Sequence, residues 1–332
     1  MDALRRSVRL NAPILLIIAL LWPASWALTR WLNPYYLQIV LYIGINVILA
    51  VSLNLINGIT GQFSLGHAGF MAIGAYVCAF CSMSYGQASP ALFLPVALLA
   101  GGAAAAAAGL IVGIPTLRLR GDYLAIATLG FGEIIRVVIL NTDAVGGARG
   151  LFGIPILAGF ASVYLSAVLC VAMLWRLVHS PGGRAFTAIR DDEIAAAAMG
   201  IDTTRHKIAA FTIGAVWAGI AGGLFAHSIG YIHTNSFTFL RSVEIVVMVV
   251  LGGLGSISGA VLAAIVLTVL PELLRFGAEY RMVIYSFLLI AVMLRKRRIP
   301  WKVRAMPRRL MRCGARPAID APAKRMSPPS GA

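Results

Sequence analysis

Long apolar runs separated by short polar breaks dominate the chain, and they predict membrane-spanning helices. Ten runs stand out, with boundaries accurate to a few residues, at 13–32, 36–56, 65–85, 90–114, 122–140, 160–178, 208–230, 242–254, 256–274 and 281–295. Most approach the roughly 20 residues that a helix needs to cross the hydrocarbon core. Strict apolar–polar alternation is missing, which argues against a β-barrel. The predicted fold class is all-α, a polytopic membrane helix bundle of about ten transmembrane helices.

The longest polar interruption, residues 181–202, predicts a short amphipathic helix outside the bilayer. The Pro-Gly-Gly sequence at 181–183 breaks the preceding helix. Acidic residues at 191–193 suit a helix N-terminus, and Gly200 suits a left-handed C-terminal cap. The alanines at 195–198 have little bulk, so such a helix favours docking into a groove on another protein. A solvated helical connector is an equally good interpretation from the residues alone.

Two stretches are poor ordinary spans: Asn54–Gly69 is rich in polar residues, and Leu251–Gly259 holds four glycines in nine residues. Unpaired polar groups at membrane depth cost several kcal/mol, so irregular backbone there must be buried in protein or line a cavity. Both stretches are candidates for pathway lining or for close helix crossings. The candidate residues are Asn54, Asn57, Gln62, Ser64, His67, Gly252, Gly253 and Gly255. For His67, a hydrogen-bonded structural role is favoured over a proton-linked switch.

Glu133 and Arg136 are the charged residues that fall well inside an apolar run. Their spacing of three places them on one helix face, where they can pair. Because a charge near the membrane centre costs about 2.5–3.5 kcal/mol, we expect a buried ion pair that faces the bundle interior. A structural pair that pins two helices is favoured over a substrate contact. Cys78 and Cys81 are interpreted as packing residues, and the cysteines assemble no metal site.

Composition supports a membrane protein and charge sets its orientation. The chain is 60% hydrophobic and 12% charged, against about 45–50% and 25% in soluble proteins. If both termini are cytoplasmic, 21 of the 28 Lys and Arg residues lie on the inner side. The positive-inside rule therefore predicts an N-in/C-in topology with an even number of spans.

The two ends of the chain are basic. Residues 1–12 are interpreted as a cytoplasmic segment before an uncleaved first helix, and 296–332 as a disordered cytoplasmic tail. Most of the net charge of +16 lies in that tail, which indicates contact with anionic membrane lipids and not with nucleic acid.

Enzymatic motifs are missing from the sequence. It contains no GxxxxGK[ST] phosphate loop, no GxSxG and no HExxH. We therefore expect a non-catalytic chain with no cofactor of its own.

Four colinear motifs resemble the permease subunit, LivM type, of bacterial branched-chain amino acid ABC importers, over about residues 40–295. They are GQFSLGHAGFMAIGAY at Gly61–Tyr76, LRLRGDYLAIATLGFGEIIR at Leu117–Arg136, GRAFTAIRDDEIAAAAMGID at Gly183–Asp202 and VVLGGLGSISGAVLAA at Val249–Ala264. The resemblance implies a permease domain at 13–295 in the bacterial inner membrane. It also implies a second homologous permease subunit, two ATP-binding subunits that hold ATP and Mg²⁺, and an extracytoplasmic solute-binding protein.

The resemblance further implies that 193–200 is the coupling helix within a cytoplasmic loop at 179–207. The interface with the ATPase would comprise Gly183, Arg184, Arg190, Asp191, Asp192, Glu193, Ala195, Ala196 and Gly200. The expected cargo is leucine, isoleucine or valine. The same architecture for urea, an amide or another small solute is an alternative, as is an ion-coupled secondary transporter.

Overall fold

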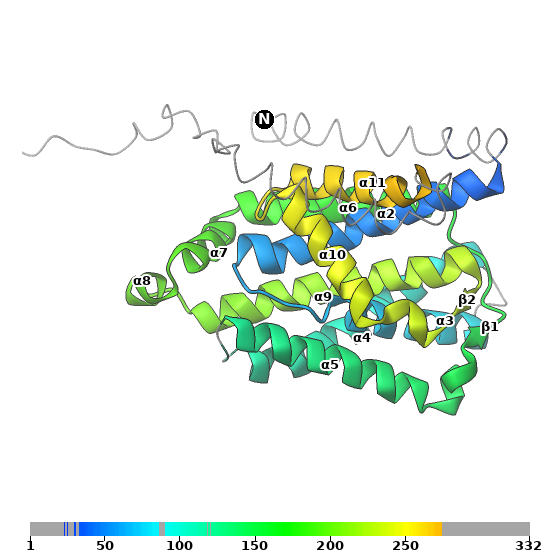
Figure 1. Ribbon diagram of the computed structural model, residues 1–332, viewed down its shortest axis with the longest axis horizontal. Helices are drawn as coiled ribbons and strands as arrows, with labels where there is room; N and C mark the ends of the chain where they lie inside the picture. The colour runs from blue at the N-terminus through cyan, green and yellow to red at the C-terminus, as the bar shows by residue number, and fades with distance from the viewer. Residues whose placement is uncertain are drawn as a thin grey trace, which may run out of the picture. The chain divides into compact units, whose positions relative to one another are not determined.

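The computed structural model describes residues 33–85, 90–117, 119 and 121–273, together with Pro23, Ser25 and Arg30. This part of the chain is mostly helical (Figure 1). The α-helices are α2 (Pro34–Asn54), α3 (His67–Tyr85), α4 (Pro90–Thr116), α5 (Asp122–Leu140), α6 (Phe160–His179), α7 (Pro181–Asp191), α8 (Glu193–Ala198), α9 (Thr203–Ile229), α10 (Phe239–Gly252) and α11 (Ile257–Leu273). A π-helix, η1 (Leu55–Ile59), extends α2, and short 3-10 helices are η2 (Asp143–Val145), η3 (Gly147–Arg149) and η4 (Thr234–Phe237). Strands β1 (Leu151–Phe152) and β2 (Tyr231–Ile232) pair antiparallel.

Seven helices in the described residues are long and apolar enough to cross a membrane, and α11 is a shorter apolar helix. These eight coincide with eight of the ten predicted runs, so the prediction of a multi-pass helical membrane protein is confirmed. The other two predicted runs, 13–32 and 281–295, lie outside the described residues except at Pro23, Ser25 and Arg30. The basic segments at 1–12 and 296–332 also lie outside them.

Small residues let α3, α4 and α9 pack closely at the core of the bundle. A β-carbon on Gly74 of α3 would overlap the backbone of Gly219 on α9. A β-carbon on Gly219 would in turn lie 2.6 Å from the β-carbon of Ala105 on α4. Lipid tails are as apolar as the side chains, so close backbone packing replaces the hydrophobic effect as the attraction between such helices.

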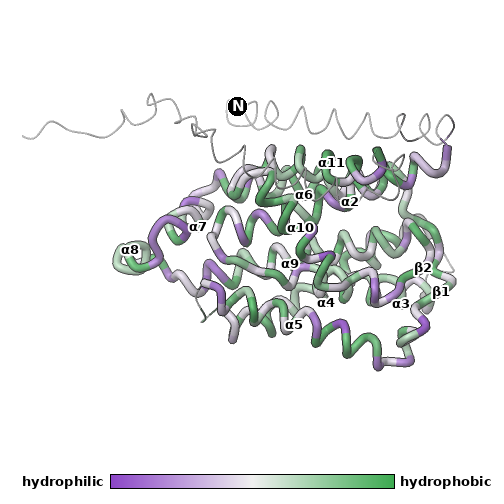
Figure 2. The backbone as a smooth tube through the Cα atoms, in the orientation of Figure 1, coloured by the Kyte–Doolittle hydropathy of each residue, from purple (hydrophilic) through white to green (hydrophobic). Residues whose placement is uncertain are grey.

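Helices α5 and α6 lie at the periphery, and their exposed residues are largely apolar (Figures 1 and 2). On α5, for example, Ile126, Ile134 and Val138 are exposed, as are Leu165, Leu169 and Met173 on α6. Apolar faces of this kind are suited to lipid or to another membrane subunit.

The two predicted helix breaks are present. At the first break, α2 and its extension η1 end at Ile59. Residues 60–66 then run back along the bundle before α3 begins at His67 (Figure 1). The second break separates α10 from α11, where Gly253 and Gly255 have φ of +102° and +83°. Both values fall where a β-carbon is strained, so these turns require glycine.

The polar interruption holds two helices where the sequence predicted one. Residues 181–183, interpreted only as a break, form the first turn of α7. The Ser180 side chain accepts a hydrogen bond from the Gly183 N–H at 3.2 Å, and Pro181 occupies the first helical position. Serine at the cap followed by proline is a start signal, so the same residues end α6 and begin α7.

The glycine crossing generates a prediction about stability. Replacing Gly74 by alanine forces α3 away from α9, so we expect a loss of roughly 1–3 kcal/mol in folding free energy, as for other overpacked cores. Thermal unfolding of the purified protein in detergent measures this loss. Gly130→Ala is the matched control, because nothing lies within 4 Å of its β-carbon position. Equal melting temperatures for both variants would contradict the crossing.

Candidate functional site

Helix α8 projects from one end of the described bundle, opposite β1 and β2 (Figure 1). The Asp192 carboxylate accepts hydrogen bonds from the N–H groups of Ile194 and Ala195, at 2.9 and 3.0 Å. Gly200 ends the segment with φ of +84°. The predicted acidic start and glycine end are therefore both present, and they define this six-residue helix without help from distant residues.

Three of the four alanines of α8, at positions 195, 197 and 198, are exposed. Ala196 is only 5% exposed, so it packs against its own chain and cannot serve the predicted interface. Ile194 and Met199 are 71% and 83% exposed, which leaves two large apolar side chains in solvent. Glu193 is held to α9 by an ion pair with Lys207. The exposed alanines, together with Ile194 and Met199, are therefore its available contact surface.

The remaining residues of the predicted interface divide into two groups. Arg184, Asp191, Asp192, Ala195 and Gly200 are exposed. Gly183 is buried, because its β-carbon position overlaps backbone at the end of α6.

Arg190 is exposed, and its side chain also reaches the membrane bundle. Its Nη1 donates a hydrogen bond to the Gly58 carbonyl oxygen at 3.4 Å, and β-carbons on Gly61 and Gly255 would lie 3.0 and 2.9 Å from its side chain. The Asp191 carboxylate accepts hydrogen bonds from Nε and Nη2 of Arg190. The Arg190 guanidinium therefore touches both helix breaks and ties them to α7.

Buried amides join the two breaks directly. The Asn54 side-chain oxygen accepts a hydrogen bond from the Gly255 N–H at 2.9 Å. The Asn57 amide bonds both backbone groups of Ser64, at 3.1 and 3.3 Å. These side chains supply the partners that a broken helix lacks. Of the predicted residues, Asn54 and Gly255 thus meet across the two breaks, and Asn57 and Ser64 meet within the first break.

The other polar residues of the first break are also buried. His67 Nε2 lies 2.9 Å from the Ser52 hydroxyl oxygen. Gln62 and Ser64 are 3% and 1% exposed. Their side-chain polar atoms have no hydrogen-bond partner among the described residues.

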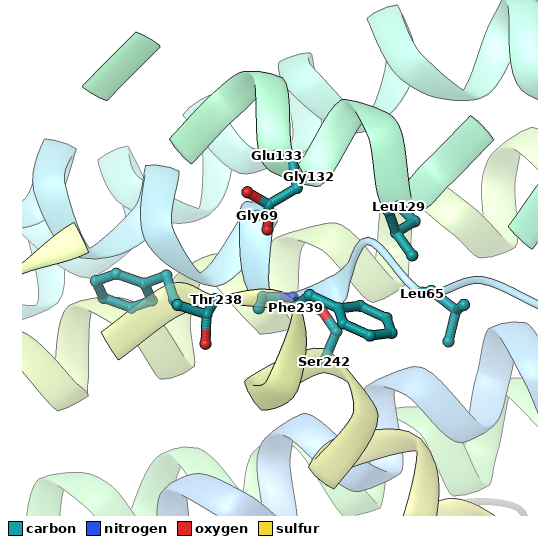
Figure 3. A pocket seen from close by; sticks show the side chains of 10 residues that line it. Leu65, Gly69, Leu129, Gly132, Glu133, Thr238, Phe239 and Ser242 are labelled. Atoms are coloured by element: carbon teal, nitrogen blue, oxygen red, sulfur yellow. Dashed lines mark hydrogen bonds between the residues drawn. The ribbon is translucent and has the colours of Figure 1, made fainter. Parts of the chain in front are cut away.

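A small cavity lies where α5 meets the first turns of α3 and α10 (Figure 3). Glu133 lines it, and Figure 3 shows this side chain directed from α5 toward Gly69. The Ser242 hydroxyl accepts a hydrogen bond from the Ala68 N–H, which joins α10 to α3. The volume of about 10 Å³ is barely enough for one water molecule. An organic solute can enter only if the helices move apart.

Glu133 and Arg136 form the predicted pair, with 2.7 Å between Oε2 and Nε. The prediction that the pair is buried is wrong within this chain, because the two side chains are 35% and 27% exposed. Both residues lie on α5, so the pair does not by itself pin two helices.

Helix α10 begins earlier than its apolar run predicted. Its predicted run began at 242, whereas the helix begins at Phe239 and Thr238 lines the cavity beside it. The signal that was available is Thr238, a threonine directly before the apolar residues. Among the described residues, no group of three potential metal ligands gathers, and Cys78 and Cys170 are buried.

The family model for the branched-chain amino acid transport system permease component matches residues 35–293. The chain belongs to this family of permeases. The permease is 39% identical over 315 residues to the high-affinity branched-chain amino acid transport system permease protein LivM of Salmonella typhimurium, and equally to that of Escherichia coli. Each alignment covers 84% of this chain and 72% of the relative.

Another relative carries a different description. The autoinducer 2 import system permease protein LsrC of Photorhabdus laumondii is 35% identical over 139 residues, covering 40% of this permease and 42% of LsrC. No solved structure matches the chain.

The cap of α8 generates a prediction about local order in this permease. Asp192→Ala removes the acceptor for two helix N–H groups, which typically costs 0.5–2 kcal/mol, commonly about 1. We expect hydrogen exchange at Ile194 and Ala195 to accelerate roughly fivefold, since about 1.4 kcal/mol is a factor of ten. Asp192→Asn keeps an oxygen at the cap and should retain most of the protection. Unchanged exchange in the alanine variant would refute the capping role.

Proposed function

We propose that this permease moves leucine, isoleucine and valine across the bacterial cytoplasmic membrane as a subunit of an ATP-driven ABC importer. Similarity to LivM over most of the chain supports this cargo. The similarity to LsrC, by name a permease for autoinducer 2, makes another small solute the second candidate. The LsrC relatives match between 40% and 63% of the chain at 30–35% identity, against 84% at 39% for LivM, so the amino acid cargo is favoured.

The proposed assembly contains a second homologous permease subunit, two ATP-binding subunits and an extracytoplasmic solute-binding protein. Family membership supports the ATP-binding and solute-binding components. The chain lacks a phosphate-binding loop, so ATP and Mg²⁺ belong to the partner subunits and this subunit is non-catalytic.

The proposed topology has cytoplasmic termini and ten spans within a transmembrane domain at 13–295, including 13–32 and 281–295. The distribution of Lys and Arg supports it. Residues 179–207 then form the cytoplasmic coupling loop, and 1–12 and 296–332 are cytoplasmic basic segments that meet anionic lipid.

The observation that supports coupling best is the capped helix α8 with its exposed apolar side chains Ile194 and Met199. Exposed apolar side chains on an otherwise polar loop are typical of a surface that a partner covers. We assign this surface to the cleft of an ATP-binding subunit. Closure of the two ATPases would then displace α8 and α7 together.

Arg190 supplies the next step of the proposed path. It contacts Gly58 and Gly255, one from each helix break. Beyond the first break, α3 begins beside the Glu133 cavity, and α10 joins that cavity to the second break. A displacement of α7 would therefore be transmitted through Arg190 and the two breaks to the helices that wall the cavity.

The proposed function itself is tested by reconstitution. Proteoliposomes with both permeases, both ATPases and the binding protein should take up radiolabelled leucine only when ATP is supplied. ATP-independent uptake by this chain alone would overturn the importer assignment in favour of a secondary transporter.

The docking surface generates a prediction about assembly. Ile194→Asp places a charge in the proposed ATPase cleft, so we expect at least a tenfold weaker association with the ATP-binding subunits, as for a desolvated interface residue. Co-purification from detergent measures the association. The control is Ile156→Asp, which alters an equally exposed isoleucine, 70% against 71%, near β1 at the other end of the described bundle. Equal co-purification of both variants would exclude α8 from the interface.

Arg190 generates a prediction about coupling. Arg190→Ala removes the contact between α7 and both breaks, so we expect more ATP hydrolysed per leucine imported, by about tenfold. The ratio is measured in proteoliposomes, where changes in protein amount cancel. Arg205→Ala, which removes an exposed arginine at the start of α9, should keep the wild-type ratio. A normal ratio in Arg190→Ala would show that the movement takes another route.

A further inference from the structure

A second cavity lies on the same seam between α3 and α5 as the Glu133 cavity. We name it the α3–α5 cavity. Its volume is about 330 Å³, and it lies between the later turns of α3 and the end of α5. The lining residues include Ile73, Tyr76, Val77, Phe80, Ile139 and Val145. The lining is almost entirely apolar, and the volume falls at the lower end of the range of small-molecule sites.

The two cavities follow one face of each helix. On α5, Glu133 lines the first cavity and Ile139 the second, and Arg136 lies one turn from each. On α3, Gly69 lines the first cavity and Ile73 the second, four residues further on. Residues three or four apart share a helix face, so both cavities and the ion pair belong to one continuous strip.

Glycine contacts close one end of this strip. A β-carbon on Gly66 would overlap the Thr128 carbonyl oxygen, and one on Gly69 would lie 3.0 Å from the Gly132 α-carbon. The Leu65 N–H also donates a hydrogen bond to the Thr128 hydroxyl at 3.0 Å. The helices touch here and leave open space further along, so the larger cavity can be filled without separating this contact.

The ion pair offers both charges of an amino acid zwitterion a partner. Within the described part of the chain, Arg136 bonds Glu133 through Nε, so its two terminal amino groups remain for a carboxylate. The Glu133 carboxylate can accept hydrogen bonds from an ammonium group. Charged side chains within a membrane span mark a solute pathway or a protein interface, because lipid does not solvate them.

Tyr76 contributes its aromatic ring to the apolar lining of the α3–α5 cavity. This residue is 3% exposed, and its hydroxyl has no hydrogen-bond partner among the described residues. The hydroxyl itself is not accessible from the cavity, so a solute there would contact the ring of Tyr76 and not its hydroxyl.

We propose that the α3–α5 cavity binds the aliphatic side chain of the transported amino acid, while Glu133 and Arg136 bind its ammonium and carboxylate groups. This inference rests on the proposed function and adds the site. An acyl chain of a lipid would fit the apolar cavity but would leave the adjacent charges unused. An aliphatic amino acid matches both the apolar lining and the pair of opposite charges.

The test compares two neighbouring residues of α5 in the complete reconstituted importer. Ile139→Trp partly fills the cavity, so we expect uptake of leucine to fall more than uptake of valine. The leucine-to-valine uptake ratio should fall at least fourfold. A fourfold change corresponds to the free energy of burying about one methylene group, by which the two side chains differ. Val138→Trp introduces the same side chain at an exposed position outside the cavity lining and should keep the wild-type ratio.

The outcomes separate the site from the function. If the wild-type complex imports neither amino acid, the proposed function fails. If it imports both and Ile139→Trp changes the ratio no more than Val138→Trp does, the cavity does not bind the side chain. Equal loss of leucine and valine uptake would also overturn the site, since it indicates a structural or lipid-binding role for the cavity.

Discussion

The need to satisfy backbone polar groups away from water constrains this structure most strongly. Two helices are interrupted within the bundle, and each interruption frees N–H and C=O groups that lipid cannot bind. The side chains of Asn54 and Asn57 bond part of this backbone, and Arg190 bonds the Gly58 carbonyl. Because Asn54 and Arg190 connect the two breaks, we expect movement at one break to affect the other. A requirement of local hydrogen bonding thereby becomes a mechanical connection between distant parts of the chain.

The glycines at the breaks share one structural role in this connection. Gly58, Gly61 and Gly255 leave room for asparagine and arginine side chains to approach the backbone closely. At the core, Gly74 and Gly219 serve a different end, since they bring α3 and α9 together without any intervening side chain. The first set forms a polar joint and the second a tight apolar crossing. A rigid crossing beside a hydrogen-bonded joint favours movement at the joint, because dense packing resists continuous deformation.

Sequence reasoning was accurate where the determining interactions are local. Hydrophobic runs located α4, α5 and α6 to within a few residues, and the Asp192 carboxylate bonds N–H groups only two and three residues away. It failed where orientation depends on packing. Ala196 faces inward and Arg190 reaches the breaks because of how α7 and α8 rest on other helices, which no periodicity in a short segment reveals. Likewise, the spacing of Glu133 and Arg136 predicted their pairing, but their exposure depends on which neighbours cover α5.

The ion pair on α5 also suggests how a transporter avoids holding its cargo too tightly. In this structure Glu133 and Arg136 neutralise each other at 2.7 Å, so neither charge lies unpaired. A bound zwitterion exchanges this pair for two others, and the cost of desolvating the protein charges is nearly the same in both states. Net affinity then comes mainly from burying the aliphatic side chain. Such a site binds well enough to select its solute and weakly enough to release it, which is what passage requires.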